Sequence, residues 1–501
     1  MVIKKRPSFK EIKQSTATHA SPEELFKKLP GRASTHGYLR GPQQDVLRAY
    51  AEKDATTSDV AFELPTGTGK TAVGLLIAEW KRLSGQKVAY LCLTNQLAGQ
   101  VLLEAEKVGL SCADLRGSKE TRSSLEEGRY RTGQAVAVTT YSNLFNTYPV
   151  IKEADLIICD DAHGAEQYVS DMWTVSASIF NNAPLYESLV AGLRPGLSES
   201  QMRVILDRSS FAAMEMADVQ GHPECIDNVI QVLDQLQNDN ARYAWKLIRH
   251  RIDCCLFLVS PFEVTIRPLI PPTFKHAPFA NAKQRIYMSA TLGGESDLLR
   301  AYGILKLHII RAKSEQWGRR YVFVPGVYTS EEDAYKIAGQ LWDGMKTRRA
   351  VVLAPSTRIL ERTINAFQGA TQNTPTRMGA ADIENSLNGF TASLDVVLGL
   401  AGRYDGLDLP DDQCRLLFLS ESPAAINALE RHLSERWKMG PILRRRERTR
   451  LTQGMGRCTR NATDFAIIFW LGQSLVNSAT SGVLINALPT ELAAEIRWGV
   501  E

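Results

Sequence analysis

Residues 62–71 read Phe-Glu-Leu-Pro-Thr-Gly-Thr-Gly-Lys-Thr, and an apolar run follows them. This order predicts a strand, a turn with two glycines, and the start of a helix. Gly67 and Gly69 let the backbone curl so that successive N–H groups point at phosphate oxygens, and the helix N-terminus adds its positive dipole end. Lys70 can reach the β- and γ-phosphates, and the Thr71 hydroxyl can bind Mg²⁺. The residues predicted to surround the phosphates are Thr66, Gly67, Thr68, Gly69, Lys70 and Thr71.

A second stretch completes the nucleotide site. Residues 156–163 read Leu-Ile-Ile-Cys-Asp-Asp-Ala-His. An apolar strand here delivers two carboxylates at its C-terminal end, where ligands bind in open α/β sheets. Asp160 is expected to hold Mg²⁺ through water, and Asp161 to orient and polarise the attacking water. Together the two stretches predict ATP and Mg²⁺ as cofactors.

Short apolar runs separated by helix-length segments recur along the chain. This rhythm is typical of βαβ units and a parallel sheet. It occurs twice, which predicts an α/β protein with two such domains. The runs lie at 60–64, 88–93, 135–139 and 156–159, and again at 350–353, 396–400, 416–419 and 465–470.

Residues 166–284 interrupt the rhythm. Ile226, Val229, Ile230 and Leu233 repeat at helical spacing, so this block is expected to be a mainly helical insert. Strand-like runs are seen near its end, at 255–259 and 263–267. Its aromatic residues could stack bases or, as is more common at helical spacing, belong to a core. The predicted domains are a basic N-terminal arm at 1–30, a first domain at 31–165 completed by 285–315, the insert at 166–284, and a second domain at 316–501.

Composition limits the classes of function. There is no apolar run of 18 residues and no apolar stretch after the basic N-terminus, so neither a membrane span nor a secretory signal is expected. The eight cysteines contain no CxxC pair, which suits reduced thiols in the cytoplasm. Residues 431–460 hold ten lysines and arginines against two glutamates. This basic stretch fits either phosphate binding or a solvated helix face.

Further short motifs occur in an order that resembles superfamily 2 helicases, over residues 38–472. Arg40-Gly41-Pro42-Gln43 resembles the upstream element whose glutamine reads adenine. The other matching segments are 64–71 (motif I), 93–96 (motif Ia), 138–141 (the next strand-side motif), 160–163 (motif II, DExH), 289–291 (motif III), 353–356 (motif IV), 402–408 (motif V) and 453–460 (motif VI, QxxGRxxR).

The resemblance implies two RecA-like domains that close on ATP. Gln43 would contact adenine, and Gly406 and Asp408 would contribute to the nucleotide site from motif V. Arg457 and Arg460, with Gln453 beside them, would reach the γ-phosphate across the cleft and stabilise developing charge. The candidates for contacts to the nucleic-acid backbone are Thr94, Asn95, Thr139, Thr140, Ser356 and Arg403.

Motif V and the insert look most like the XPD/DinG branch, which implies movement on single strands, commonly 5′ to 3′. The chain departs from that branch in two ways. Members with an iron–sulfur cluster have four cysteines between motifs I and II, whereas this chain has only Cys92, Cys112 and Cys159. A [4Fe–4S] cluster is therefore not expected. Asp161 also stands where the family usually has glutamate.

The sequence thus predicts an ATP-dependent helicase or translocase that acts on single-stranded nucleic acid, with DNA favoured over RNA. One alternative is a nucleotide-gated sensor or scaffold with weak ATPase activity, suggested by Asp161. Another is an RNA helicase. Because no nuclease or other effector motif is evident, an effector could be supplied by a partner protein. No membrane partner is expected.

Overall fold

The first RecA-like sheet has seven parallel strands in the order β11-β1-β10-β5-β2-β4-β3. Every residue of β2 and of β4 is buried, as continuous apolar strands covered on both faces require. The strands are β1 (Asp59–Glu63), β2 (Val88–Cys92), β3 (Cys112–Asp114), β4 (Val136–Thr140), β5 (Leu156–Cys159), β10 (Gln284–Ser289) and β11 (His308–Arg311).

Helices cover both faces of this sheet, and alternate strand residues enter two different cores. Phe62 and Tyr90 lie in the core on one face, whereas Ala61 and Leu91 lie in the core on the other. The helices of this part are α1 (Pro22–Lys28), α2 (Gly41–Ala49), α3 (Lys70–Leu83), α4 (Asn95–Val108), α5 (Ser124–Arg131), α6 (Tyr141–Leu144), α12 (Ala277–Ala280) and α13 (Glu295–Tyr302).

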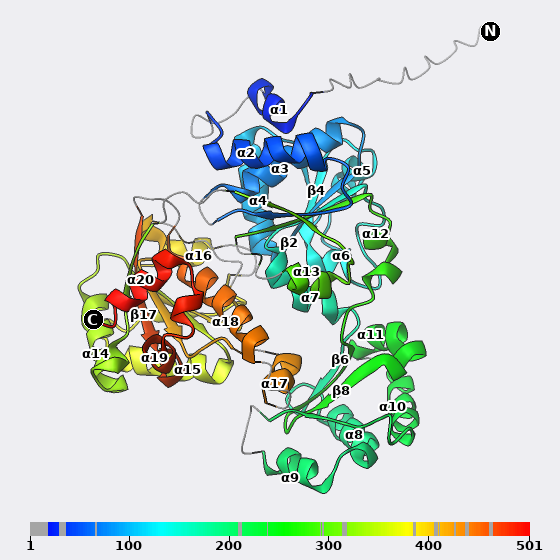
Figure 1. Cartoon of the computed structure of the whole chain (residues 1–501), viewed down its shortest axis with the longest axis vertical. Helices are drawn as coiled ribbons and strands as arrows, with labels where there is room; N and C mark the ends of the chain where they lie inside the picture. The colour runs from blue at the N-terminus through cyan, green and yellow to red at the C-terminus, as the bar shows by residue number, and fades with distance from the viewer. Residues whose placement is uncertain are drawn as a thin grey trace, which may run out of the picture.

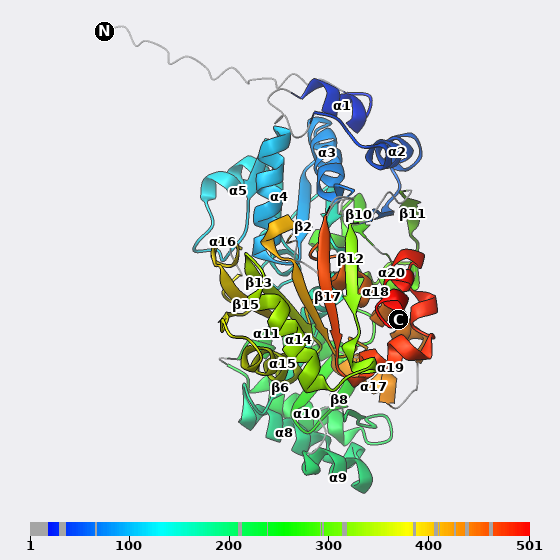
Figure 2. The same ribbon diagram turned by 90° about the vertical axis from the view of Figure 1, so that its left-hand side faces the viewer.

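The second sheet has six parallel strands in the order β12-β17-β16-β13-β15-β14. Figure 2 shows α14 and α15 on one side of it and α19 and α20 on the other. The two parallel sheets confirm the predicted pair of RecA-like domains. The elements are β12 (Arg319–Phe323), α14 (Glu331–Asp343), β13 (Arg348–Ala354), α15 (Thr357–Gly369), β14 (Thr376–Met378), α16 (Asn388–Ala392), β15 (Asp395–Ala401), β16 (Leu416–Ser420), α17 (Ala428–Glu435), α18 (Gly440–Met455), β17 (Phe465–Leu471), α19 (Gln473–Ser481) and α20 (Thr490–Trp498).

Between β5 and β10 the chain forms a separate helical layer on a four-stranded antiparallel sheet, ordered β6-β9-β8-β7. The sequence predicted the helices and the strands at 255–259 and 263–267, but not β6, β7 or the sheet. Both missed strands have four residues or fewer. The elements are α7 (Glu166–Asp171), β6 (Val175–Ser178), α8 (Ala183–Leu193), α9 (Glu199–Asp207), β7 (Glu215–Met216), α10 (Glu224–Asp234), α11 (Ala241–Ile248), β8 (Cys255–Val259) and β9 (Glu263–Pro268).

The insert contacts the second domain as well as the first. In Figure 1 the insert lies below the first domain, and α17 of the second domain lies against it near β8. Leu258 of β8 packs there with Leu429 and Leu433 of α17 in a small apolar cluster. The insert therefore spans from one RecA-like domain to the other.

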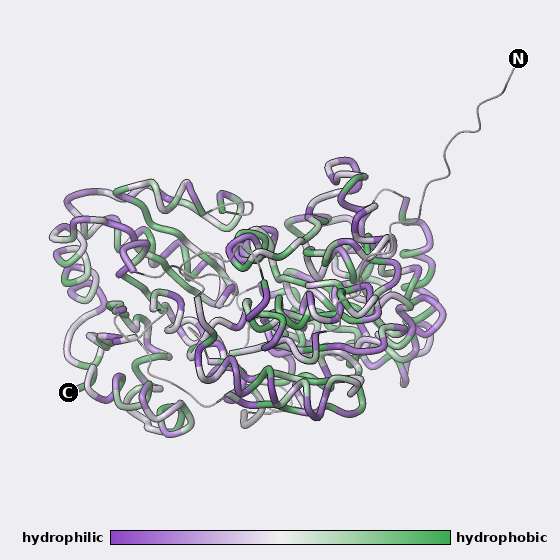
Figure 3. The backbone as a smooth tube through the Cα atoms, turned by 90° about the horizontal axis from the view of Figure 1, so that it is seen from above, coloured by the Kyte–Doolittle hydropathy of each residue, from purple (hydrophilic) through white to green (hydrophobic). Residues whose placement is uncertain are grey.

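The structure is a computed structural model that describes residues 19–29, 37–65, 68–208, 213–237, 239–290, 292, 295–312, 318–383, 387–404, 409, 411–424, 427–435, 440–459 and 464–501. Hydrophobic and hydrophilic stretches are interspersed along the tube in Figure 3. Over the described residues, no helix has both the length and the apolar character that crossing a membrane demands.

Candidate active site

The Lys70 side chain lies between the two carboxylates that follow β5. Its Nζ atom is 3.1 Å from Asp160 Oδ1 and also contacts Asp161 Oδ1. Burial alone would lower the pKa of Lys70, but the carboxylates of Asp160 and Asp161 more than offset it, so the pKa is raised. The lysine is therefore held as a cation. The structure thus brings together the three charged residues that the two sequence stretches predicted.

The two carboxylates differ in their electrostatics. Burial raises the pKa of Asp160 despite the opposing effect of Lys70, and Tyr90 donates a hydrogen bond to Asp160 Oδ2 at 3.1 Å. Burial acts in the same direction on Asp161, but Lys70, Arg457 and His163 outweigh it and lower the pKa of Asp161 to about 2. Asp161 is therefore anionic at neutral pH and able to accept a hydrogen bond from water.

Arg457 approaches this site from the second domain. It follows α18, and its Nε atom donates to the carbonyl oxygen of Tyr404 at 2.9 Å. Its positive charge is among the causes that lower the pKa of Asp161, so its electrostatic influence reaches the carboxylate from the other domain. Gln453 is buried in the last turn of α18. The other predicted residues of the second domain, Gly406, Asp408 and Arg460, lie outside the described residues.

Gln43 of α2 contacts the P-loop itself. Its Nε2 atom donates to the carbonyl oxygen of Gly69 at 3.3 Å, and its Oε1 atom accepts from the Arg40 N–H at 2.8 Å. Gly69 has a φ of 78°, which favours glycine, and a Cβ atom there would displace the Gln43 amide from its contact with the P-loop. Thr68 is buried, with its hydroxyl donating to the carbonyl oxygen of Pro65 at 2.7 Å. Predicted Thr66 and Gly67 fall outside the described part of the chain.

The residues present fit a nucleotide with Mg²⁺. Thr71 is half-buried in the first turn of α3, beside Lys70. Over the described residues, no group of three or more histidine, cysteine or acidic side chains could hold a metal ion. Mg²⁺ in nucleotide sites needs no such cage, because it keeps several waters and binds one or two protein oxygens plus phosphates. Thr71 and Asp160 would supply those protein oxygens.

Three buried hydroxyls hold the backbone and one carboxylate of motif II, a role that the sequence did not predict for any of them. Besides Tyr90, the Tyr141 hydroxyl donates to the carbonyl oxygen of Asp160 at 2.8 Å, and the Tyr302 hydroxyl donates to that of Ala162 at 2.9 Å. All three tyrosines are fully buried. In the sequence Tyr90 and Tyr302 look like any other aromatic residue of a core. Tyr141 ends the matched segment 138–141, but nothing in that segment indicates a contact with motif II.

Motif II is also tied to motif III. His163 Nδ1 and Ser289 Oγ form a hydrogen bond of 2.5 Å, and Ser289 is the last residue of β10. The two residues lie in the segments 160–163 and 289–291, which the sequence matched to motifs II and III. The contact joins the end of β5, which carries motif II, to the end of the neighbouring strand β10, which carries motif III.

Predicted nucleic-acid contacts converge on a cavity between the two domains. Thr94, Asn95 and Thr140 of the first domain and Arg403 of the second line a cavity of about 380 Å³. Ser356 does not line it: this exposed residue caps α15, where its hydroxyl accepts from the Ile359 N–H.

The expectation for Thr139 requires a correction. Thr139 is fully buried, and its hydroxyl donates to the carbonyl oxygen of Leu115 at 2.6 Å and accepts from Asn143 at 2.9 Å. Successive strand residues point to opposite faces, so Thr139 faces the core while its neighbour Thr140 faces the cavity. A nucleic acid cannot reach the Thr139 hydroxyl in this structure.

Ion pairs join the domains beside motif II. Glu166, the first residue of α7, pairs with Arg300 of α13 at 2.6 Å and with Arg446 of α18 at 2.9 Å. Arg446 also pairs at 2.5 Å with Glu430, which is fully buried and holds Arg450 at 2.6 Å. The basic stretch was expected to bind phosphate or to be solvated. For Arg446 and Arg450 it instead builds a network within the protein.

Two family models match separate parts of the chain. The model for the res subunit of type III restriction enzymes matches residues 37–184, and the model for the helicase C-terminal domain matches residues 344–491. The first match contains the P-loop and motif II, and the second contains Gln453 and Arg457. A search of curated protein sequences finds no significant match.

Solved structures share the fold. An XPD helicase has a TM-score of 0.53 and 14% identity, over 87% of this chain and 96% of that one. A second structure, of apo XPD, gives 0.53 and 16%, over 85% and 94%. Xpd4 of S. tokodaii gives 0.52 and 14%, over 90% and 99%. At identities this low, the matches show a shared fold and nothing finer.

The site and its two sheets define a P-loop NTPase of two RecA-like domains. The family matches support a nucleic-acid helicase, and the architecture is one that XPD helicases share. Its helicase domains imply an ATP-dependent enzyme.

Proposed function

We propose that this protein hydrolyses ATP in the cleft between its two RecA-like domains and uses the energy to move along single-stranded nucleic acid, with DNA as the favoured substrate. The observation that carries the proposal is the charge cluster of Lys70, Asp160 and Asp161, with Arg457 beside it from the other domain. Arg457 belongs to the second domain, so it can act on the γ-phosphate only when the two domains close. Such a dependence is what couples hydrolysis to domain movement in motors of this kind.

The chain's own residues would divide the work as follows. When ATP binds, Lys70 exchanges its carboxylate partners for the β- and γ-phosphates. Bound Mg²⁺ would neutralise phosphate charge, held by Thr71 and Asp160. Asp161, left with a free carboxylate, accepts a hydrogen bond from the attacking water, and Arg457 stabilises charge that develops on the γ-phosphate. Gln43, which contacts Gly69 of the P-loop, would contact the adenine.

Binding of the strand is supported by the cavity of about 380 Å³, whose polar lining comes from both domains. Contacts from Thr94, Asn95, Thr140 and Arg403 would be to phosphate and sugar, which position a strand without reading its sequence. Because one side of the cavity belongs to each domain, opening and closing of the ATP cleft would displace one set of contacts relative to the other.

A second candidate function, a nucleotide-gated sensor or scaffold with slow turnover, is favoured by one observation. Asp161 has a φ of 48°, in the left-handed region, and its side chain is one methylene shorter than the usual glutamate. Both features could leave the carboxylate too far from the attacking water. An effector protein would then respond to whether ATP is bound.

The eight cysteines carry no disulfide in the structure, which suits the cytoplasm as the proposed setting.

The test is ATPase activity measured without polymer and with single-stranded DNA, single-stranded RNA and duplex DNA. We expect strong stimulation by single-stranded DNA and weaker stimulation by the other two. Stimulation by RNA above that by DNA would make the protein an RNA helicase. No stimulation, with tight ATP binding and slow turnover throughout, would favour the sensor. Binding should also fall steeply with salt and depend little on sequence, because the contacts are to phosphate.

A further inference from the structure

The sheet of the insert has one apolar face and one polar face. In the register of β6 and β9, Ser176 lies opposite Thr265 and Val175 lies opposite Ile266. Val175 and Ile266 are fully buried in the core. Ser176, Thr265 and the next residue of that face, Arg267, line a cavity of about 1300 Å³ between the insert and both RecA-like domains. The polar face is therefore turned toward the centre of the molecule.

Arg267 is an unusual cation on this face. Only 4% of its surface is exposed, yet it forms no ion pair with any described residue. Its one hydrogen bond there is from Nε to the carbonyl oxygen of its neighbour Pro268, at 3.3 Å. Burial lowers the pKa of Arg267. Glu166, Asp171 and Glu430 act on Arg267 only from beyond ion-pair distance, and keeping a charge buried without a direct partner is costly, so the guanidinium could take an anion that enters the cavity.

Carboxylates near Arg267 are engaged elsewhere or are less acidic. Glu166 is held by Arg300 and Arg446, and Glu430 is held by Arg446 and Arg450. Asp171 accepts a hydrogen bond from Gln167, and burial raises its pKa. Arg446, which lines the same cavity, pairs with two glutamates. Arg267 is about as buried as Arg446, but it forms no ion pair with either glutamate.

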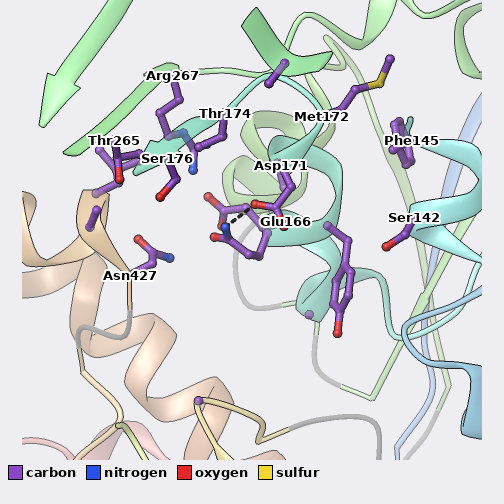
Figure 4. Close-up of a pocket in the computed structure, with 18 of the residues that line it drawn as sticks. Ser142, Phe145, Glu166, Asp171, Met172, Thr174, Ser176, Thr265, Arg267 and Asn427 are labelled. Carbon is purple, nitrogen blue, oxygen red and sulfur yellow. Dashed lines mark hydrogen bonds between the residues drawn. The ribbon is translucent and has the colours of Figure 1, made fainter. Parts of the chain in front are cut away.

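Two hydroxyls extend the donor set. The side chains of Thr265 and Ser176 make no hydrogen bond to any described residue, and both line the cavity. Figure 4 shows them beside Arg267 and Thr174 on the insert, with Asn427 of the second domain facing them. A guanidinium flanked by hydroxyls matches a phosphate, which accepts paired N–H donors from arginine and further bonds from hydroxyls.

We propose that Arg267, Thr265 and Ser176 form a binding site for a backbone phosphate of the single-stranded nucleic acid, inside the cavity between the insert and the two domains. The site rests on the proposed function and adds to it a third point of contact, on the insert. Arg403 and Gln453 line the same cavity, so a strand held here would also lie next to motifs V and VI. The contact carries no base specificity.

The test is the affinity for a fluorescently labelled oligo(dT), measured from about 50 to about 200 mM salt. Arg267→Gln should weaken binding about tenfold. It should also reduce the slope of log affinity against log salt by about 0.7, the value for one phosphate of a single strand. Thr265→Val should give a smaller loss. The matched control is Arg249→Gln: this insert arginine is exposed, pairs with Asp234 and does not line the cavity, so its slope should equal that of the wild type.

The thermal midpoint separates this site from a structural role. Because Arg267 is buried and unpaired, Arg267→Gln should keep or raise the midpoint without nucleic acid. A lowered midpoint with an unchanged salt slope would show that the arginine is structural, and would overturn the proposal. An unchanged slope and affinity would overturn it as well. If the wild type binds no oligo(dT) and no RNA, the proposed function fails and this site fails with it.

Discussion

The ATP cleft and the wall of the insert hold positive charge in opposite ways. In the cleft, Lys70 contacts two carboxylates and its pKa is raised. In the insert, Arg267 forms no ion pair with a described carboxylate, and burial lowers its pKa despite the more distant Glu166, Asp171 and Glu430. A cation that already has partners is fixed in place and must exchange them to bind a ligand. A cation without partners binds more readily, at the expense of stability. We therefore expect substitutions in the cleft to change turnover and substitutions in the insert to change affinity.

The largest expected effect is at Lys70. Lys70→Ala should remove ATPase activity, because the β- and γ-phosphates lose the positive charge that the lysine supplies. Among the described residues, no other cation of the P-loop contacts Asp160 and Asp161 and could replace it. The protein should remain folded by circular dichroism. Lys87→Ala is the control, since this half-buried lysine of the same domain pairs with the exposed Glu153 away from the cleft. Near-normal turnover in Lys70→Ala would refute the assignment of the P-loop.

Asp161 comes next. Asp161→Asn keeps the shape of the side chain but removes the negative charge, so single-turnover hydrolysis should fall by about 10²-fold or more while ATP still binds. Asp161→Glu is the informative partner variant. A wild type as slow as Asp161→Asn, together with a much faster Asp161→Glu, would contradict the motor and support the gated sensor.

The ion pairs between the domains should have an intermediate effect. Arg446→Gln leaves Glu166 paired with Arg300 and Glu430 paired with Arg450, so no carboxylate loses all its partners. The domains lose part of their preorganisation, and the KM for ATP should rise by about three- to tenfold while kcat changes little.

A double-mutant cycle sharpens this prediction. Glu166→Gln combined with Arg446→Gln should cost less than the sum of the two single variants, because both remove the same contact. Arg362→Gln serves as the control, because its exposed ion pairs lie wholly within the second domain. Strict additivity in the cycle would mean that the bridge does not couple the domains.

The smallest expected signal is iron. Cys92 and Cys159 lie in different cores, on opposite faces of the first sheet. They could bind one iron–sulfur cluster only if that sheet unfolded. The purified protein should be colourless and contain no stoichiometric iron. Iron near four atoms per chain, with broad visible absorption, is the result that would reverse this expectation.

The sequence was informative wherever a pattern is long or chemically specific. The continuous apolar runs predicted both parallel sheets, because a strand covered on two faces must be apolar throughout. Residues 62–71 and 156–163 predicted which charged side chains meet. Short elements gave no such signal: in β6, Val-Ser-Ala-Ser alternates over only four residues, too few to distinguish a strand from a loop.

Orientation and distant contacts could not be read from the motifs. The pair Thr139 and Thr140 identifies the strand end, but only one of two neighbouring residues can face the cleft, and the sequence does not say which. Arg267 was overlooked for a related reason. Its significance comes from the lack of a carboxylate partner, and partners are set by segments far away in the chain, such as the helix that carries Arg446.

The position of β1 in its sheet has a consequence for folding during synthesis on the ribosome. Its two neighbours are β10 and β11, both of which begin more than 200 residues after β1 ends. At a synthesis rate of about 5–20 residues per second, roughly 10 to 45 seconds pass before β1 can pair. During that time the strand that leads into the P-loop has two open edges, which invite wrong pairing. Each nascent chain is therefore expected to gain ATP binding late, after the ribosome has passed residue 311.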